Sequence, residues 1–377
     1  MDECLRYNVS RLTAIGILDS GDKWKAKLKM AVCVISAASM FIVSTIDLID
    51  HVYDFASVAE NLSILLVGFA SWTKLFIMIY GRDKVIRFVQ IIENRKVREA
   101  TTETDDSIIS QYDQMGHRFS KSYEWIVRGA GFLMLLPPLL GFLLDGEKIP
   151  PFPAWYPFDV NKSSNYLICF IHQMTITYVV VLTYVAFDSW FVFLVFHASG
   201  HLCLLQDWLE NFTNCQKNDR QAREKIVRSV RLHQKINQFV ADVEEFFSFS
   251  NLVQFLLGSV AICISGYQVI VTNSNHQQYL KHICSIIGQT VQLLMINWSG
   301  QLIQDKSFGV SLAAARSKLY ELEMVDQKDI CLVVLQAQKP MYITAGKFYQ
   351  LSLPNFATLM KTSMSYFTML RSVSEKN

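Results

Sequence analysis

The sequence predicts an all-α membrane protein with seven transmembrane helices, an inverted topology (cytoplasmic amino terminus, extracellular carboxyl terminus) and a cytoplasmic helical anchor region. Composition is the first indication, because 51% of the 377 residues are hydrophobic and only 18% are charged, against about 25% charged residues in soluble domains. Long stretches with almost no charged side chains are the second, and the uneven placement of Lys and Arg is the third. The net charge of +2 leaves no basic excess, so we expect no binding to nucleic acid.

Seven stretches are long and apolar enough to cross a bilayer core of about 30 Å, which takes roughly 20 helical residues. Within them, Lys74 and Lys361 are costly unless each meets water, an acid or lipid headgroups. The connections hold fewer than 65 residues, so we expect residues 1–377 to form a single membrane domain. The expected spans are about residues 30–50, 61–81, 126–145, 163–187, 252–272, 279–304 and 348–372.

The distribution of basic residues predicts the orientation, since Lys and Arg are retained on the cytoplasmic side of short loops. The amino terminus and every second connection carry 28 of the 35 Lys and Arg, while the alternate connections and the tail carry 5. This bias places the amino terminus inside and, after seven crossings, the carboxyl terminus outside, which is opposite to a G-protein-coupled receptor. Asn161 begins an Asn-X-Ser motif on the expected outer side and is a candidate glycosylation acceptor.

The long cytoplasmic connections are expected to be helical. Apolar residues recur at steps of three and four from Ile226 to Phe247, a spacing that predicts an amphipathic helix. We place anchor helices at about residues 188–251 and 305–347. Their apolar faces either bury against one another or meet neighbouring subunits, and the amount of apolar surface favours the second alternative.

The sequence offers no site typical of an enzyme, a metal or a cofactor. The eight cysteines lack the paired short spacing of zinc and redox sites. His197 and His201 are four residues apart, but no third ligand accompanies them. Cys263 and Cys284 fall in the outer parts of the fifth and sixth spans, where the sequence leaves a disulfide open.

The last span carries a family resemblance. The segment KFYQLSLPNFATLMKTSMSYFTMLRS, residues 347–372, resembles the seventh helix of insect odorant receptors, with its Leu-Ser-Leu segment, its Tyr-Phe pair and its basic-Ser ending. The sixth span and its extension, QLLMINWSGQLIQDKSFGVSLAAARSKLYELE, are similar to the same family, although Glu321 follows Tyr320 where many members have Trp. The segment HASGHLCLLQDWL is similar to the extension of the family's fourth helix.

The resemblance implies an odorant receptor subunit of a ligand-gated, non-selective cation channel. Such subunits bind small volatile apolar or aromatic molecules and form a heterotetramer with the odorant receptor co-receptor, mostly through the anchor helices. It implies the plasma membrane of a sensory neuron dendrite, and conduction of monovalent cations, with divalent cations left open. The seventh helices line the pore, and the family pattern places Met369, Ser372 and Val373 at its constriction, where apolar side chains close a pore by dewetting.

The resemblance also places the ligand pocket in the outer half of the second, third, fourth and sixth spans. These stretches are apolar and aromatic, which suits a small neutral ligand held by shape and dispersion. For every residue, ordinary packing between helices is the alternative interpretation. Two other functions stay open: a gustatory-type receptor channel for involatile ligands, and a multipass transporter or membrane enzyme. The candidate pocket residues are Phe69, Trp72, Thr73, Phe132, Leu135, Leu136, Met174, Thr177, Tyr178, Ile286, Ile287 and Thr290.

Overall fold

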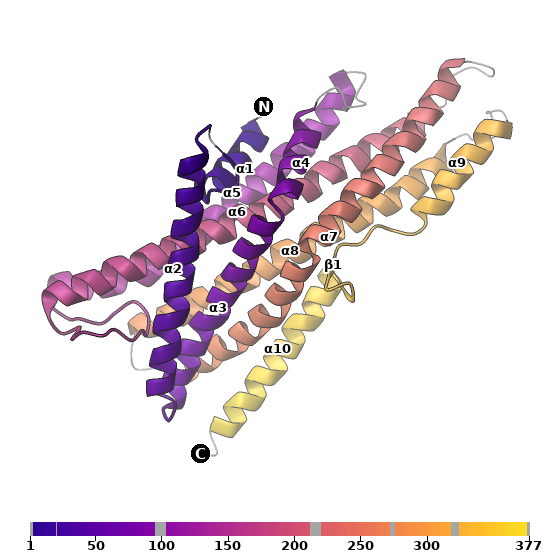
Figure 1. Ribbon diagram of the computed structural model, residues 1–377. Coiled ribbons are helices and arrows are strands. Elements are labelled where there is room, and N and C mark those ends of the chain that lie inside the picture. Colours follow the sequence, from indigo (N-terminus) through magenta and orange to yellow (C-terminus); the bar gives the residue numbers. More distant parts are fainter. Residues whose placement is uncertain are drawn as a thin grey trace.

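The computed structural model describes residues 3–19, 21–94, 103–211, 220–271, 276–317 and 324–374. Long helices lie side by side in an elongated bundle, which confirms the expected all-α class (Figure 1). In chain order the elements are α1 (Glu3–Ala14), α2 (Lys23–Asp50), α3 (Phe55–Tyr80), α4 (Arg82–Glu93), α5 (Glu103–Leu144), α6 (Ser163–Glu210), α7 (Arg220–Val271), α8 (His276–Arg316), α9 (Met324–Ala337), β1 (Thr344–Ala345), β2 (Tyr349–Gln350) and α10 (Leu353–Ser374).

Helix α6 is the central element of the bundle. Every residue from 182 to 200 is buried, and α6 contacts α1, α2, α3, α5, α7 and α8. A helix that is apolar on all sides is stable only when other elements surround it. The largely apolar composition of this segment on all sides therefore explains why the other helices pack around it.

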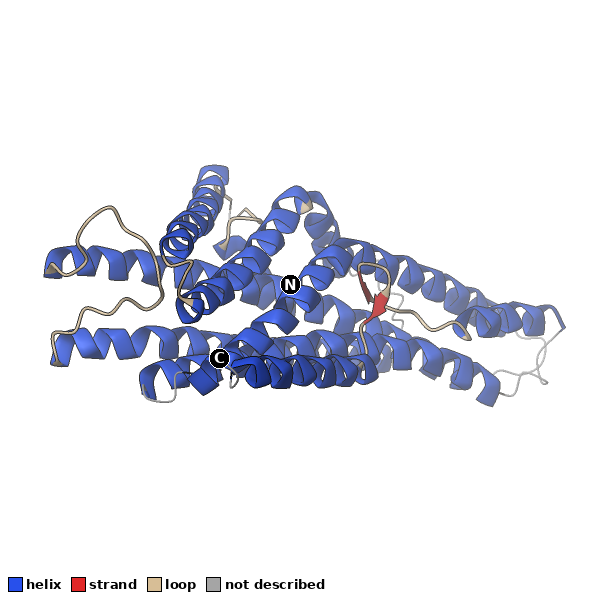
Figure 2. Ribbon diagram, turned by 90° about the horizontal axis from the view of Figure 1, so that it is seen from below, coloured by secondary structure: helices blue, strands red, loops and turns tan. Residues whose placement is uncertain are grey.

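Several helices continue well beyond the expected spans. Helices α5, α6, α7 and α8 each hold more than 40 residues and extend towards the upper end of the bundle in Figure 1, where α1 and α9 lie. The turn between α2 and α3 and the end of α10 lie at the opposite, lower end, so the two termini are far apart. Figure 2, seen from below, shows the same elongated arrangement.

Five of the described helices, α2, α3, α5, α6 and α7, contain stretches long and apolar enough to cross a membrane. Helices α8 and α10, which contain the sixth and seventh expected spans, do not meet the same measure of length and hydropathy within the described residues. Their sequences explain the difference, because Gln and Asn recur along α8 and hydroxyl side chains recur along α10. The span boundaries stay a prediction.

The start of the expected last span differs from the prediction. A short antiparallel hairpin precedes α10, with Thr344 opposite Gln350 and Ala345 opposite Tyr349. Three residues, 346–348, connect the paired residues Ala345 and Tyr349, and the first two of them are left-handed, Gly346 at φ 64° and Lys347 at φ 66°. The helix begins only at Leu353, so residues 348–352 of the expected span are not helical.

Candidate functional site

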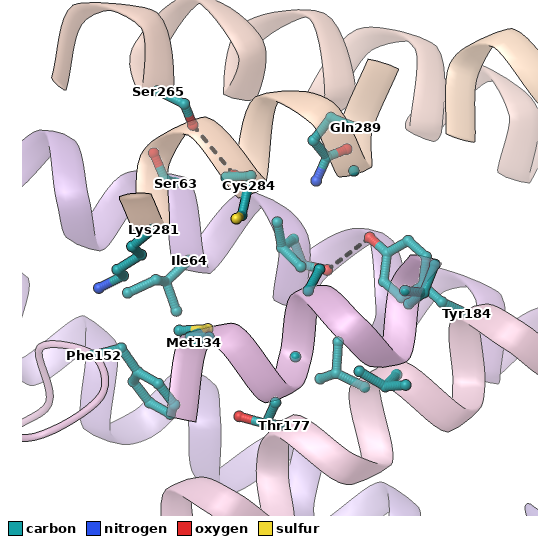
Figure 3. A pocket seen from close by; sticks show the side chains of 18 of the residues that line it. Ser63, Ile64, Met134, Phe152, Thr177, Tyr184, Ser265, Lys281, Cys284 and Gln289 are labelled. Atoms are coloured by element: carbon teal, nitrogen blue, oxygen red, sulfur yellow. Dashed lines mark hydrogen bonds between the residues drawn. The ribbon is translucent and has the colours of Figure 1, made fainter. Parts of the chain in front are cut away.

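A cavity of about 220 Å³ lies in the lower half of the bundle, between α2, α3, α5, α6, α7 and α8. Its walls are mostly apolar, and Figure 3 shows Ile64, Met134, Phe152 and Thr177 around the common space. Pockets for drug-sized ligands usually measure about 300–1,000 Å³. This cavity is smaller, so its size and lining suit a small, largely apolar molecule.

A loop between α5 and α6 covers the lower end of the cavity. Phe152 of this loop is 2% exposed and lines the cavity. The Gln173 carboxamide on α6 makes two hydrogen bonds with the backbone of Phe152: Oε1 accepts from N–H at 3.2 Å, and Nε2 donates to the carbonyl at 3.0 Å. The N–H of Trp155 also donates to the carbonyl of Val43 on α2 at 3.0 Å. These bonds hold the loop in place as a cap.

An ion pair lies at the capped end. Lys281 Nζ on α8 is 2.5 Å from Glu60 Oε1 on α3, and it also donates to the carbonyl of Pro151 at 3.0 Å. Both charged residues line the cavity, and each side chain is about a fifth exposed. Nearby, burial raises the pKa of Tyr156 to about 12, so this phenol in the cap remains protonated at neutral pH.

A second, fully buried ion pair lies behind the other end of the cavity. Lys74 Nζ on α3 is 2.6 Å from Asp188 Oδ1 on α6, and the side chains are 1% and 2% exposed. Asp188 Oδ2 accepts hydrogen bonds from Tyr123 on α5 and Gln292 on α8, both at 2.6 Å. Tyr123 and Gln292 line the cavity. The cluster therefore connects four helices directly to the cavity wall.

Sequence reasoning missed this cluster. It treated Lys74 as an intramembrane base and ended the fourth span at residue 187, one residue before Asp188. A buried charge needs an opposite charge and further hydrogen bonds. The signal that could have found the cluster was the coincidence of one base and one acid within the apolar segments.

The structure brings one of the twelve candidate pocket residues, Thr177, into the cavity wall. Thr73 is buried and donates to the carbonyl of Phe69 on its own helix at 2.9 Å. Phe69, Phe132, Met174, Tyr178 and Ile287 are between 44% and 63% exposed on the surface of the bundle. The remaining candidates, Trp72, Leu135, Leu136, Ile286 and Thr290, are partly buried and are not among the lining residues of this cavity.

The neighbours of the candidates on the same helices line the cavity instead. Ile64 and Val67 do so from α3, Met134 from α5, Val180 from α6 and Gly288 from α8. Helices α3, α5, α6 and α8, which contain the second, third, fourth and sixth expected spans, thus contribute to the cavity wall, but most of them present a different face to it. Whether any candidate contacts a ligand stays a prediction.

Met369, the first candidate for the pore constriction, is 63% exposed on α10. Ser372 and Val373 fall within the backbone of α10, but their side chains lie outside the described part. Leu359 and Ser363 are buried against α7 and α8, and the opposite face of α10 is exposed. Met369 lies on that exposed face.

The remaining candidate positions have simple surroundings. Asn161 is exposed in the loop between α5 and α6, as an acceptor of glycosylation must be. Cys263 and Cys284 are free thiols. His197 Nδ1 lies 2.9 Å from Asp113 Oδ1, and His201 Nε2 lies 3.3 Å from His197 Nε2. Within the described ranges, no three His, Cys, Asp or Glu side chains gather as a metal site.

Comparison with known proteins gives consistent matches. The family model described as "7tm Odorant receptor" matches residues 54–364. Odorant receptor 10 of Aedes albopictus is 26% identical over 234 residues, which cover 61% of this chain and 62% of the relative. Odorant receptor 13a of Drosophila melanogaster is 29% identical over 259 residues, which cover 64% of this chain and 62% of the relative. The chain thus spans about 60% of the length of these relatives.

Other similarities cover nearly the whole chain. Odorant receptor 9a of Drosophila melanogaster is 20% identical over 384 residues, covering 98% of this chain and 96% of the relative. The solved structure of the insect olfactory receptor OR5 from Machilis hrabei in complex with eugenol has a TM-score of 0.85 and 16% identity, covering 99% of this chain and 100% of that one. At this identity, the structural likeness shows the fold alone.

Proposed function

Because the chain belongs to the insect odorant receptor family, we propose that it binds a small volatile molecule in the cavity and thereby gates a non-selective cation channel. The family is one of receptors and not of enzymes. The observation that carries the proposal is the small, mostly apolar cavity lined by six helices and capped by the loop held on Gln173. We propose that ligands reach it from the extracellular side.

The size of the cavity limits the affinity. A ligand of about ten heavy atoms gains at most roughly 1.5 kcal/mol per atom, and typical efficiencies nearer half of that correspond to micromolar binding. Dispersion and the removal of apolar surface from water provide most of this free energy, because the walls are largely hydrocarbon. We therefore expect micromolar responses and broad tolerance of ligand shape.

The exposed face of α10 supports a pore-lining role for this helix. Thr358, Thr362, Ser365 and Thr368 are all exposed, and each hydroxyl donates to a backbone carbonyl of the same helix. Lys361 is exposed on the same face. A polar helix face at membrane depth is favourable where it lines water. We propose that this face lines the pore and that Met369 narrows it.

Helix α7 offers a direct mechanical connection between the cavity and α10. Ser265 of α7 lines the cavity. One residue further along the chain, a Cβ atom at Gly266 would lie only 2.9 Å from Phe367 of α10. Cys263 Sγ donates to the carbonyl of Ser363 at 3.4 Å. We propose that a bound ligand favours a position of α7 in which α10 moves away from the pore axis, which is a shift between two populations.

Exposed apolar side chains on α9 and beside the hairpin support assembly with other subunits. Leu332 and Leu335 of α9 are 65% and 60% exposed, and Phe348 beside the hairpin is 72% exposed. Patches of this kind mark surfaces that contact other proteins. We propose that the anchor region, at about residues 188–251 and 305–347, contacts co-receptor subunits in a heterotetramer in the plasma membrane of sensory dendrites. The orientation with the amino terminus inside is part of this proposal.

Current recording in cells tests the proposed function. The chain is expressed with and without the co-receptor, its surface expression is measured, and a panel of volatiles is applied. We expect ligand-evoked cation currents at micromolar concentrations when both proteins are present. Normal surface expression without current for any volatile would contradict the proposal.

A further inference from the structure

One carboxamide in the cavity wall has an unused hydrogen-bonding atom. Gln268 lies near the lower end of α7, lines the cavity and is 4% exposed. Its Oε1 atom is buried and accepts no hydrogen bond from any residue that the structure describes. Buried polar atoms in proteins nearly always have a partner, and leaving one unpaired is costly. This atom therefore indicates a partner that the described part of the chain does not provide.

Three other buried polar side chains of the same wall are already engaged in hydrogen bonds. Tyr123 and Gln292 donate to Asp188, and Tyr184 donates to the carbonyl of Val67 at 3.2 Å. Within the described part of the chain, Gln268 Oε1 is the only fully buried side-chain nitrogen or oxygen on a lining residue that lacks a partner. The unused hydrogen-bonding capacity of the described cavity wall thus lies at a single residue of α7.

The surroundings of Gln268 form a polar corner in an otherwise apolar cavity. Ser265 lies one turn earlier on the same face of α7, since residues three apart are neighbours on a helix. Its Oγ is 3.3 Å from the Oγ of Ser285 on α8 (Figure 3). Ile64, Met134 and Val180 line the cavity from other helices. A ligand with one polar end and a hydrocarbon body matches this arrangement.

We infer that the preferred ligands are small alcohols or phenols, whose hydroxyl group donates a hydrogen bond to Gln268 Oε1. This inference rests on the proposed function and names its ligand class. A hydroxyl group has an O–H donor, so it can supply the hydrogen bond that Oε1 lacks. A ketone or an ether only accepts, and would leave Oε1 unpaired. A hydrocarbon would leave the whole carboxamide unpaired.

The test compares ligands of one carbon skeleton in cells that express the chain with the co-receptor. The set consists of an alcohol, the corresponding ketone, the methyl ether and the hydrocarbon. For the wild type, we expect the alcohol to act at a half-maximal concentration about tenfold lower than the other three, as one additional hydrogen bond to a buried group provides. Gln268→Met keeps the length of the side chain. It should bring the ratio of half-maximal concentrations between the alcohol and the other three ligands close to one.

A matched control uses the same helix. Asn251 is also buried on α7, and its Nδ2 has no hydrogen-bond partner within the described residues, but it does not line the cavity. Asn251→Leu should leave the ratio of half-maximal concentrations between alcohol and hydrocarbon unchanged. If Gln268→Met does not reach the cell surface, Gln268→Asn, which withdraws the carboxamide by one methylene group, should lower the ratio as well.

Three results separate the inference from the proposed function. Equal potency of alcohol and ketone in the wild type would overturn the inference, and so would an alcohol preference that survives both substitutions of Gln268. Either result would leave the proposed function intact, because ligands would still evoke currents. Silence of the wild type towards all volatiles at normal surface expression would contradict the proposed function itself.

Discussion

Lys74 Nζ on α3 lies 2.6 Å from Asp188 Oδ1 on α6, and neither side chain reaches the surface of the bundle. The ammonium group also lies 4.1 Å from the centre of the Tyr184 ring, a favourable cation–π position. Together with the hydrogen bonds from Tyr123 and Gln292, this arrangement satisfies both charges. The pair is therefore a fixed connection between helices immediately behind the cavity.

Removing one member of this pair should be strongly destabilising. Lys74→Met leaves Asp188 as an uncompensated buried charge, which costs about 3–5 kcal/mol. Thermal unfolding of the purified protein in detergent measures the loss. The double variant Lys74→Met/Asp188→Asn carries no charge and keeps an acceptor for Tyr123, so it should recover most of the stability. A double variant as unstable as Lys74→Met would show that the charges are not coupled.

The two hydrogen bonds between Gln173 and Phe152 should control the cap. Gln173→Leu leaves the buried N–H and carbonyl groups of Phe152 without these partners, at a cost of about 1–3 kcal/mol. Because Phe152 lines the cavity, the half-maximal ligand concentration should rise. Gln173→Glu keeps an acceptor for the N–H but places a buried carboxylate against the Phe152 carbonyl, so it should not restore the wild-type value. Thr175→Val, an exposed position on the same helix, is the control and should change nothing.

Gly288 should limit the size of the ligand. An added Cβ atom at Gly288 meets no atom within 4 Å, and the residue lines the cavity. Gly288→Ala therefore fits without strain but occupies ligand space. In a homologous alcohol series, the largest active member should lose about three- to fourfold in potency, as burial of one methylene group provides. Gly129→Ala on α5 is the control, since an added Cβ atom there also meets no atom within 4 Å and the residue does not line the cavity. An equal loss of potency in Gly129→Ala would show that Gly288 does not limit ligand size.

Met369 should determine the conductance of the closed pore. Met369→Ala or Met369→Ser removes apolar bulk from the exposed face of α10 and should increase the basal current or change ion selectivity, since dewetting needs a narrow apolar ring. Recording in the absence of ligand measures the basal current. Met364→Ala, at a residue 59% exposed on another face of the same helix, should behave as the wild type. Unchanged conductance and gating in both Met369 variants would remove this residue from the constriction.

Stability should fall in mild acid because of two buried histidines outside the expected membrane spans, His117 on α5 and His233 on α7. Burial lowers the pKa of His233, and burial together with the charge of Lys121 lowers that of His117. In the unfolded chain a histidine titrates near pH 6.5. Below that pH the unfolded state binds more protons than the folded state, so the free energy of unfolding decreases until the folded-state pKa is passed.

Melting temperatures between pH 7.5 and 5 measure this effect. His233→Leu should weaken the dependence of the melting temperature on pH, because it removes a histidine that is protonated in this range only in the unfolded state. His51→Gln, at an exposed residue beyond the end of α2, is the control. If the melting temperature of His233→Leu depends on pH as that of the wild type does, burial of this histidine does not contribute to the loss of stability in acid.

The lengths and contents of the helices could largely be predicted from the sequence, because apolar composition and spacing are local properties. The continuation of α6, α7 and α8 beyond the spans followed from the same pattern. The hairpin before α10 was missed because it depends on left-handed residues at Gly346 and Lys347, and the apolar residues beside it suit a membrane span equally well. The partner of Lys74 was missed because it lies 114 positions further along the chain.

The sequence by itself determined that this chain is a helical membrane protein of the odorant receptor family, since hydropathy and short motifs persist without any contact between distant residues. Only the tertiary structure decided which face of each helix meets the cavity. Neighbouring residues on a helix point about 100° apart, so the change from Tyr178 to Val180, or from Ile287 to Gly288, separates the bundle surface from the cavity wall. The orientation of each helix about its own axis results from packing around α6 and from the hydrogen bonds and ion pair of Asp188. These contacts join residues that are far apart in the chain.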